Sequence, residues 1–435
     1  MQDHAPAAVP ASAPPGPAGT NWAGNLIYRA ARLHRPTSVA EVQEIVSRSP
    51  RVKALGSRHC FNDVADTTGD LVSLEDLPDD VAFDLPEGDA PGVAWVPGGM
   101  QYGRLLPELA RRGYALHNLA SLPHITVAGA TATGTHGSGN RNGSLSTSVV
   151  GLELVRSDGE LVTFGPGSPD LPGAVVHLGA LGVVTRIGLR VQPTFSVRNN
   201  VYLGLTWERL LADLDGVADA AYSVSVFTNW HEITAVFVKS RVDEVETAPE
   251  EFFGARSATV PTHMLPDTPV ENLTEQLGIP GEWHERLPHF QVGFTPSRGE
   301  ELQSEYFVPR EHGRAAVEAL RALAPRLAPL LMASEIRTVA ADELWLSPAY
   351  GTDVLALHFT WFRDEARVRA VLPDIEEAIA PCGARPHWGK LSTTGAAELD
   401  RLFPRLGDFR GLVRRHDPRG AFRNDFLDRT IAAHG

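Results

Sequence analysis

Apolar and polar residues alternate in residues 354–362, VLALHFTWF, which is the pattern of a strand with one buried face. The alternate positions place His358 and Thr360 together on the face opposite the core. In residues 332–341, MASEIRTVAA, Glu335 and Arg337 are two positions apart and share one face of a strand. The positions predicted to face the core are Leu355, Leu357, Phe359 and Trp361.

If these two strands pair, a carboxylate, a guanidinium, an imidazole and a hydroxyl meet on one surface. The alternative is a solvated face of an antiparallel sheet, which is common. Solvated faces favour Lys, Glu and Thr, whereas here a histidine and an arginine are flanked by bulky apolar groups. The set as a whole therefore favours a polar pocket.

Helical and strand patterns alternate in the first half of the chain. Residues 35–49, RPTSVAEVQEIVSRS, combine Ser38 at a candidate N-cap with Glu41 three positions on, which predicts a helix. Strands are predicted at 51–55, 92–96 and 178–193, and a helix at 101–113 with Pro107 inside it. The second half has longer strands and helical patterns at 313–331 and 364–382. The chain is therefore predicted to be α+β with two domains.

The composition of the chain argues against some classes of binding partner and some cellular locations. The net charge of −14 and a pI near 5.6 disfavour nucleic acid, and no run approaches the roughly 18 apolar residues of a membrane span. Two cysteines cannot form a framework of disulfides, which fits a reducing compartment or a protein that is indifferent to redox conditions. Residues 1–19 are rich in proline and alanine, lack the features of a secretory signal and are predicted to be a disordered tail. We expect a cytoplasmic, monomeric protein.

Lysine is rare in this chain. Of the 39 basic residues only Lys53, Lys239 and Lys390 are lysine. An ammonium group is compact and its pKa is readily tuned, so arginine does not replace it. Each lysine therefore becomes a candidate for a specific role.

One cysteine follows a histidine directly after a strand, in residues 53–63, KALGSRHCFND. His59 and Cys60 allow four interpretations: a metal site, a nucleophile with its base, a cofactor attachment point, or packing. No second His or Cys lies at ligand spacing, so a metal is disfavoured and none is expected.

Residues 121–144, SLPHITVAGATATGTHGSGNRNGS, are rich in Gly, Thr and Ser. Such a segment lets backbone N–H groups approach an anion closely, pyrophosphate being the usual one. Gly137, Gly139 and Gly143 nearly form the dinucleotide fingerprint, but the last spacing is one residue too long and no acidic ribose partner follows. A nicotinamide Rossmann site is therefore disfavoured. A flexible surface loop is the other alternative, and the interleaved threonines weaken it.

Six stretches of the chain carry a resemblance to a known family: GSRHCFND, SLPHITVAGATATGTHGSG, GALGVVT, LQSEYFVPREH, EIRTVAADELWLSPAYG and RPHWGK. Together they resemble the bacterial alditol oxidases, which belong to the vanillyl-alcohol oxidase class of FAD enzymes. The resemblance covers about Asn21 to Phe426, and the RPHWGK stretch is shared more widely with aldonolactone oxidases. The implied fold is a two-domain vanillyl-alcohol oxidase-type fold, with an FAD-binding (PCMH-type) domain at 20–195, a substrate domain with an antiparallel sheet at 196–375, and a C-terminal segment at 376–435 that returns to close the active site.

The resemblance implies that FAD is bound covalently through His59, and that Cys60 is a neighbour without a role in attachment. Ala120 matches the position that controls oxygen access, which favours an oxidase over a dehydrogenase. Pro97 departs from the glycine that relatives tend to carry. The other implied cofactor-binding residues are Ala54, Leu55, Gly56, Ser57, Arg58, Cys60, Ser121, Thr126, Gly129, Thr133, Gly134, Thr135, His136, Val183, Gly188, Thr360 and His387.

The resemblance also implies a reaction: oxidation of the terminal primary alcohol of a polyol such as xylitol or sorbitol, with molecular oxygen reduced to hydrogen peroxide. Arg337 and Lys390 would stabilise developing alkoxide charge, and His358 is the candidate base. The implied substrate-binding residues are Ser121, Glu335, Arg337, Thr360 and Lys390. The alternatives are an aldonolactone oxidase or dehydrogenase on the same fold, and a non-catalytic flavin- or sugar-binding protein.

Overall fold

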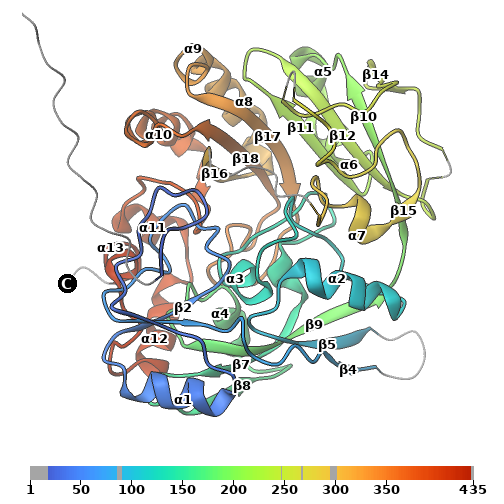
Figure 1. Cartoon of the computed structure of the whole chain (residues 1–435). Coiled ribbons are helices and arrows are strands. Elements are labelled where there is room, and N and C mark those ends of the chain that lie inside the picture. The colour runs from blue at the N-terminus through green and yellow to red at the C-terminus, as the bar shows by residue number, and fades with distance from the viewer. Residues whose placement is uncertain (1–17, 86–90, 246, 266–267, 294–300, 433–435) are drawn as a thin grey trace, which may run out of the picture.

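The architecture comes from a computed structural model of the chain, which describes residues 18–85, 91–245, 247–265, 268–293 and 301–432. Figure 1 shows two bodies stacked on one another, the lower containing both the early strands and the last helices. The tail predicted at residues 1–19 lies almost entirely outside the described residues. No helix within the described ranges combines the length and the apolar character of a membrane-spanning segment.

Two sheets form the lower body, which we call the FAD domain after the FAD-binding domain that the resemblance implies at residues 20–195. Parallel pairing joins β1 (Arg32–His34), β3 (Asp70–Ser73) and β2 (Val52–Leu55). An antiparallel sheet has the order β4 (Ala82–Asp84), β5 (Gly92–Pro97), β9 (Val183–Pro193), β7 (Val149–Val155) and β8 (Leu161–Phe164), and β6 (Tyr114–Ala115) also pairs with β9. The strands predicted at 51–55, 92–96 and 178–193 are therefore confirmed, although β9 begins five residues late.

The helices of the first half are α1 (Val39–Arg48), α2 (Tyr102–Arg111), α3 (Val127–Ala132), η1 (Leu145–Ser148) and α4 (Leu171–Val175). The predicted cap is present because the Ser38 hydroxyl accepts a hydrogen bond from the Glu41 N–H. The carboxylate of Glu41 reaches Thr37 N at 2.8 Å, one residue beyond the partner of a regular capping box. Pro107 lies inside α2 as predicted, and α3 was not predicted because its small residues carry no apolar period.

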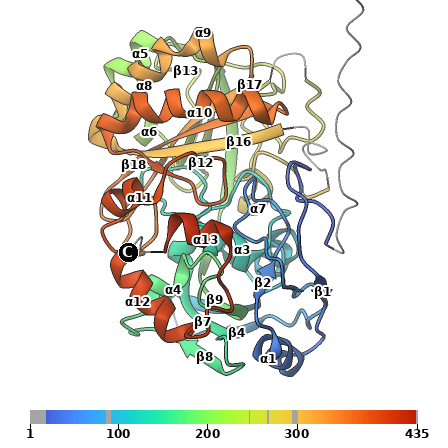
Figure 2. The ribbon, with the colours of Figure 1, turned by 90° about the vertical axis from the view of Figure 1, so that its left-hand side faces the viewer.

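A large antiparallel sheet forms the upper body, which we call the substrate domain after the domain that the resemblance implies at residues 196–375. Its order is β13 (Glu251–Phe252), β14 (Ala255–Ser257), β10 (Ser196–Leu203), β12 (Ile233–Arg241), β11 (Ser223–Thr228), β17 (Leu331–Val339), β18 (Val354–Phe362), β16 (Glu301–Pro309) and β19 (Arg385–Pro386), and β15 (Gly281–Glu282) pairs with β10. Figure 2 shows α8, α9 and α10 on the side of this sheet that faces away from the FAD domain.

The helices of this domain are α5 (Trp207–Ala212), α6 (Leu214–Asp219), α7 (Trp283–Arg286), η2 (Arg310–His312), α8 (Gly313–Ala322), α9 (Ala324–Leu327), α10 (Glu365–Ile379) and η3 (Ala380–Cys382). The single helix predicted at 313–331 is wrong, because it breaks at Leu323 just before Pro325, whose ring cannot continue a helical hydrogen-bond ladder. The domain boundary expected at residue 376 falls inside α10.

Strand β18 has the two faces that its alternation predicts. Leu355, Leu357, Phe359 and Trp361 are fully or almost fully buried in one core with Leu320 of α8 and Leu372 of α10. Full burial of one such side chain stabilises the fold by about 1.5–3 kcal/mol. The outer face of the sheet is therefore anchored by helices, and its polar inner face looks toward the FAD domain.

After β19 the chain returns to the FAD domain through α11 (Ala396–Leu402), α12 (Leu406–His416) and α13 (Asp425–Thr430). The N–H of Val52 donates to the carbonyl of Ala421 at 2.8 Å, which ties β2 to the segment before α13. The side-chain amide of Asn424 donates to the carbonyls of Asp63, Val64 and Asp66. The loop after β2 is thus held in place by residues from the end of the chain.

Candidate active site

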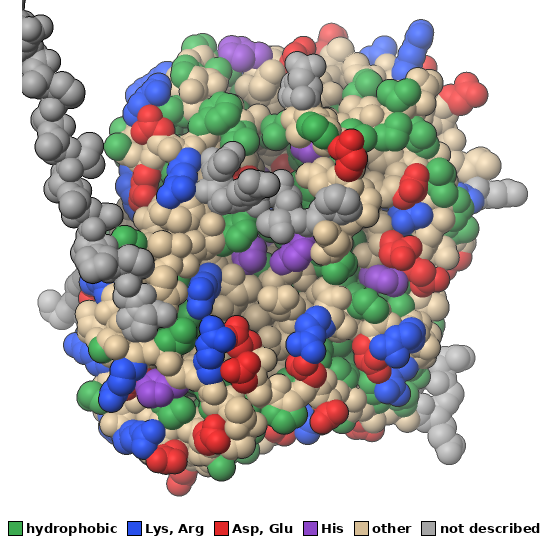
Figure 3. Space-filling view, in the orientation of Figure 1, with side chains coloured by type: hydrophobic (Ala, Val, Ile, Leu, Met, Phe, Trp, Pro, Cys, Tyr) green, Lys and Arg blue, Asp and Glu red, His purple; other side chains and the backbone are tan. Residues whose placement is uncertain are grey.

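A cavity of about 920 Å³ lies where the two domains meet. Its wall comes from the loop after β2, the Gly-rich segment, the inner face of the large sheet and residues 387–390. Histidine side chains gather near the centre of the face in Figure 3, at the level of this junction. The volume is in the range of sites that enclose small ligands and cofactors.

The loop after β2 carries His59 into the cavity wall. Arg58 has a φ of 64°, a left-handed conformation that is uncommon outside glycine and turns the chain sharply. The His59 ring stacks on Trp22, with centroids 5.3 Å apart, and its Nδ1 lies 2.9 Å from the Ser57 carbonyl oxygen. Burial lowers the pKa of His59 to about 4, so the imidazole is neutral.

The surroundings of Cys60 do not favour a nucleophile. Burial raises the pKa of its thiol to about 12, so the reactive thiolate is not populated near neutral pH. Its sulfur packs so closely against Gly389 that a Cβ there would lie 3.2 Å from Sγ. Within the described residues no group of three or more His, Cys, Asp and Glu side chains could hold a metal ion.

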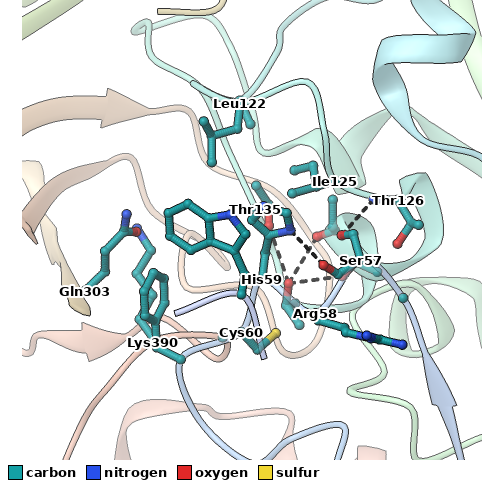
Figure 4. A pocket seen from close by; sticks show the side chains of 18 of the residues that line it. Ser57, Arg58, His59, Cys60, Leu122, Ile125, Thr126, Thr135, Gln303 and Lys390 are labelled. Carbon is teal, nitrogen blue, oxygen red and sulfur yellow. Dashed lines mark hydrogen bonds between the residues drawn. The ribbon is translucent and has the colours of Figure 1, made fainter. Parts of the chain in front are cut away.

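The Gly-rich segment fits an anionic cofactor. The Thr126 hydroxyl is buried in the cavity wall and has no hydrogen-bond partner among the described residues. A Cβ at Gly56 or Gly129 would come within 2.6 or 2.7 Å of that hydroxyl, so only glycine leaves room there. The Thr126 N–H donates to the Ser57 hydroxyl at 3.2 Å, which joins this segment to the His59 loop. Figure 4 shows Ser57 and Thr126 on one side of His59, and Gln303 and Lys390 on the other.

The polar residues of the large sheet form rows across three strands. Glu335 of β17 lies opposite His358 of β18, and His358 in turn lies opposite Glu305 of β16. Thr360 lies opposite Gln303 in the next row. The predicted meeting of Glu335, Arg337, His358 and Thr360 on one surface is confirmed, and all four side chains line the cavity.

Glu305 is the centre of the charge cluster, and sequence reasoning missed it. Its side chain is 1 % exposed, and its oxygens lie 2.7 Å from Arg337 Nη2, 2.7 Å from Lys390 Nζ and 3.1 Å from His136 Nε2. Burial acts to raise the pKa of Glu305, but Lys390, His136 and Arg337 together hold it well below its usual range. The site is therefore built as a buried anion between two cations. The sequence signal that could have found Glu305 is the alternation of side chains along β16, in which Glu305 stands between Ser304 and Tyr306 and so points to the opposite face of the sheet.

The side chains of His358 and His387, beside this cluster, are neutral. Burial lowers the pKa of His358 and that of His387 well below the usual value, and the nearby Lys390 charge adds to both shifts. His358 Nε2 lies 3.1 Å from the Gln303 side-chain oxygen. Burial also lowers the pKa of Lys390, and Glu305 opposes that shift.

Most of the predicted site residues line this one cavity, and three do not. Gly134, Val183 and Gly188 lie outside its wall. Val183 packs into a core with Val155, while its neighbours Gly182 and Val184 line the cavity. Gly188 instead faces Trp95, whose ring would lie 3.1 Å from a Cβ there. The predicted residues in the wall are Ala54, Leu55, Gly56, Ser57, Arg58, His59, Cys60, Ala120, Ser121, Thr126, Gly129, Thr133, Thr135, His136, Glu335, Arg337, His358, Thr360, His387 and Lys390.

Two family models match the chain: an FAD binding domain over residues 30–165 and D-arabinono-1,4-lactone oxidase over residues 291–430. An alditol oxidase from Streptomyces sp. is 46% identical over 94% of this chain and 97% of that protein. An L-gulono-1,4-lactone dehydrogenase from Mycobacterium tuberculosis is 30% identical over 95% of this chain and 99% of that protein.

Among solved structures, cholesterol oxidase from B. sterolicum matches with a TM-score of 0.75 at 14% identity, over 95% of this chain and 96% of that one. At that identity the match shows the fold alone. The relative that is 46% identical and the FAD-binding family model show that the chain belongs to the vanillyl-alcohol oxidase-type family of FAD-dependent oxidoreductases.

Proposed function

We propose that the protein is an FAD-dependent alditol oxidase, which oxidises the terminal primary alcohol of polyols such as xylitol and sorbitol to the aldose and reduces molecular oxygen to hydrogen peroxide. The observation that carries the proposal is the buried Arg337–Glu305–Lys390 cluster, which lines the same cavity as the His59 loop. The likeness to the Streptomyces alditol oxidase supports the choice of substrate class.

FAD would be held by the loop after β2 and by the Gly-rich segment, with a covalent bond at His59. The free Thr126 hydroxyl and the glycines beside it fit the close approach of a phosphate-bearing group. When bound, FAD supplies the hydride acceptor and the site at which oxygen is reduced. Gly134, Val183 and Gly188 lie outside the cavity wall, and a cofactor contact at these three residues stays a prediction. Ala120, which is 9 % exposed and lines the cavity, is proposed to govern oxygen access.

Arg337 and Lys390 are proposed to polarise the reacting hydroxyl. Both side chains are fixed by Glu305, so their charges are already oriented before the substrate enters. Preorganised cations of this kind stabilise negative charge that develops on an oxygen, because no reorganisation is needed at the moment of reaction. Glu335, Ser121 and Thr360 would accept or donate hydrogen bonds to the remaining hydroxyls. A site that pairs several hydroxyls discriminates strongly against analogues that lack them.

His358 is proposed to take the proton of that hydroxyl. Its low pKa keeps the ring neutral, and a hydrogen bond from Nε2 to Gln303 would leave Nδ1 as the acceptor. A base with a depressed pKa is weak on its own. The adjacent Arg337 and Lys390 compensate for this by lowering the pKa of the substrate hydroxyl.

An aldonolactone oxidase or dehydrogenase is the second candidate, which the C-terminal family match favours. Glu335 paired with Arg337 argues against the lactone, and Ala120 argues against a dehydrogenase. Purified protein should release peroxide with xylitol or sorbitol, and not with L-gulono-1,4-lactone. Peroxide from the lactone alone would establish the second candidate, and flavin binding without any turnover would indicate a non-catalytic flavin- or sugar-binding protein. We further propose that the protein is a cytoplasmic monomer, which size-exclusion chromatography with light scattering tests for the oligomeric state.

A further inference from the structure

A second buried lysine lies behind Glu335, on the side away from Glu305. Lys239 of β12 is 1 % exposed, and its ammonium group contacts the loop after α7. It donates to the carbonyls of Leu287 and Pro288 and lies 3.1 Å from Nδ1 of His289. His289 is 6 % exposed, and its Nε2 lies 2.9 Å from Oε1 of Glu335. Lys239, His289 and Glu335 therefore form one continuous row.

We propose that His289, held in one tautomer by Lys239, is a positioning residue that fixes and orients the Glu335 carboxylate for polyol binding. This inference rests on the proposed function, because Glu335 matters only if it binds substrate. His289 would act through Glu335 and is not itself a catalytic residue.

Counting protons selects the tautomer. An ammonium group has three N–H donors and no acceptor, and Lys239 has three acceptors around it. While Lys239 is protonated, His289 Nδ1 must accept, so in the neutral ring Nε2 carries the proton and donates to Glu335. Burial, with the Lys239 charge next, lowers the pKa of His289 to about 4, which keeps the ring neutral. Burial lowers the pKa of Lys239 to about 7, and Glu335 opposes that shift.

The ring of His289 has little freedom to turn. Phe227 and Phe237 pack edge-on against it, with centroids 5.5 and 5.6 Å away. Its backbone N–H donates to the carbonyl of Ser121 at 3.2 Å. His289 thus joins Ser121 and Glu335, two of the residues proposed to bind substrate, into one rigid unit.

The two carboxylate oxygens of Glu335 therefore have different partners. Oε1 is committed to His289, and Oε2 lies 3.5 Å from Arg337 Nε. The groups that face this carboxylate from neighbouring elements are Arg337 on its own strand, His358 on β18, His289 with Lys239 behind it, and Lys390. Oε2 is therefore the oxygen left to accept a hydrogen bond from a substrate hydroxyl.

Two substitutions of His289 form a matched pair. In His289→Gln the amide nitrogen replaces Nε2 and can still donate to Glu335, whereas His289→Asn replaces Nδ1 and cannot reach it. We expect kcat/KM for xylitol to fall at least tenfold in His289→Asn and in Lys239→Met, and to stay within about threefold in His289→Gln. Loss of the N–H donor at position 289 raises the pKa of Glu335. The acidic limb of the kcat/KM profile should therefore move to higher pH in His289→Asn and stay in place in His289→Gln.

The flavin absorbance and Tm of each holoenzyme show whether the fold survives. The inference is overturned if His289→Asn keeps wild-type kcat/KM, or if both His289 variants lose activity equally with no movement of the acidic limb. If His289→Asn does not fold, the kcat/KM of Lys239→Met is compared with that of His289→Gln, and the same tenfold fall against a change within about threefold is expected.

A second measurement needs no turnover. The ¹⁵N NMR spectrum of wild-type protein labelled at histidine, recorded at pH 6.5, should show His289 as the neutral Nε2–H tautomer, assigned by the signal lost in His289→Gln. An Nδ1–H tautomer or an imidazolium overturns the inference. If the Nε2–H tautomer is found but the wild type oxidises no polyol, the proposed function fails while the arrangement around Glu335 stands.

Discussion

Lys390 Nζ lies 2.7 Å from Oε2 of Glu305, and the two residues are 85 positions apart in the chain. This ion pair joins the large sheet to the segment that returns to the FAD domain. It sets the charge state of the candidate active site, because Glu305 opposes the loss of the Lys390 proton in a buried environment.

Glu305→Gln should therefore change both activity and its pH dependence. Without the carboxylate, the pKa of Lys390 falls further, so the alkaline limb of kcat/KM for xylitol should move to lower pH, with a loss of about 100-fold at neutral pH. Leaving buried cations unpaired should also cost about 3–5 kcal/mol of stability. Activity profiles and urea unfolding measure the two effects. Glu318→Gln, which removes an exposed partner of Arg314, is the control and should change stability by about 1 kcal/mol or less. An unchanged pH profile in Glu305→Gln would contradict the assigned role of the pair.

Arg337→Ala should slow the reduction of flavin by xylitol by several powers of ten. The guanidinium is 6 % exposed and fixed by Glu305, so water cannot replace it as a charge at the reacting oxygen. Anaerobic stopped-flow absorbance measures the rate directly, free of the oxygen step. Arg314→Ala, at an exposed position, serves as the control. Near-normal reduction in Arg337→Ala would remove this residue from the mechanism.

His59→Ala should abolish covalent flavin, whereas Cys60→Ala should keep it. The two residues are neighbours in one loop, so the pair separates attachment from local packing. After precipitation with acid, yellow colour should stay in the pellet for wild type and Cys60→Ala and move to the supernatant for His59→Ala. Colour retained in the His59→Ala pellet would place the bond elsewhere.

Stability should fall as the pH is lowered from about 6.5 to about 4. Burial lowers the pKa of His177 to about 3. Because the unfolded chain then binds a proton that the folded chain does not, His177 contributes stability above pH 6.5 that is lost on acidification, by about 1.4 kcal/mol per pH unit. Urea unfolding at several pH values should show a shallower slope for His177→Asn than for wild type. His312→Gln, at an exposed position, should keep the wild-type slope; equal slopes in all three proteins would refute the prediction.

The inner face of the large sheet could be predicted because its signal is local. Alternation within β18 separates His358 and Thr360 from the core residues, and Glu335 and Arg337 are two positions apart in β17. Rarity was also informative: Lys53 and Lys239 are each 1 % exposed, and Lys390 contacts Glu305. For His358, Thr360, Glu335 and Arg337, the residues within a few positions in the sequence are enough to predict which face of the sheet each side chain occupies.

Glu305 and His289 could not be predicted in the same way. The role of Glu305 depends on its ion pairs with Arg337 and Lys390, which lie 32 and 85 positions away in the chain. The same alternation in an isolated strand would equally suit a solvated face. His289 lies in an irregular loop after α7, where no period exists to read. Val183 shows a third case: its role in cofactor binding stays a prediction, and in the same strand region Gly182 and Val184 line the cavity while Val183 packs into a core.

The return of the chain after β19 has a consequence for how the protein is made. Val52 pairs with Ala421, and the loop that contains His59 is supported by Asn424, so the FAD domain lacks part of its scaffold until residues 421–424 have left the ribosome. The substrate domain, by contrast, has most of its sheet once residue 362 has been synthesised. Of these two domains, the one translated earlier is thus completed later, and a nascent chain stalled before residue 421 would hold most of the sheet of the substrate domain and no finished site for the cofactor.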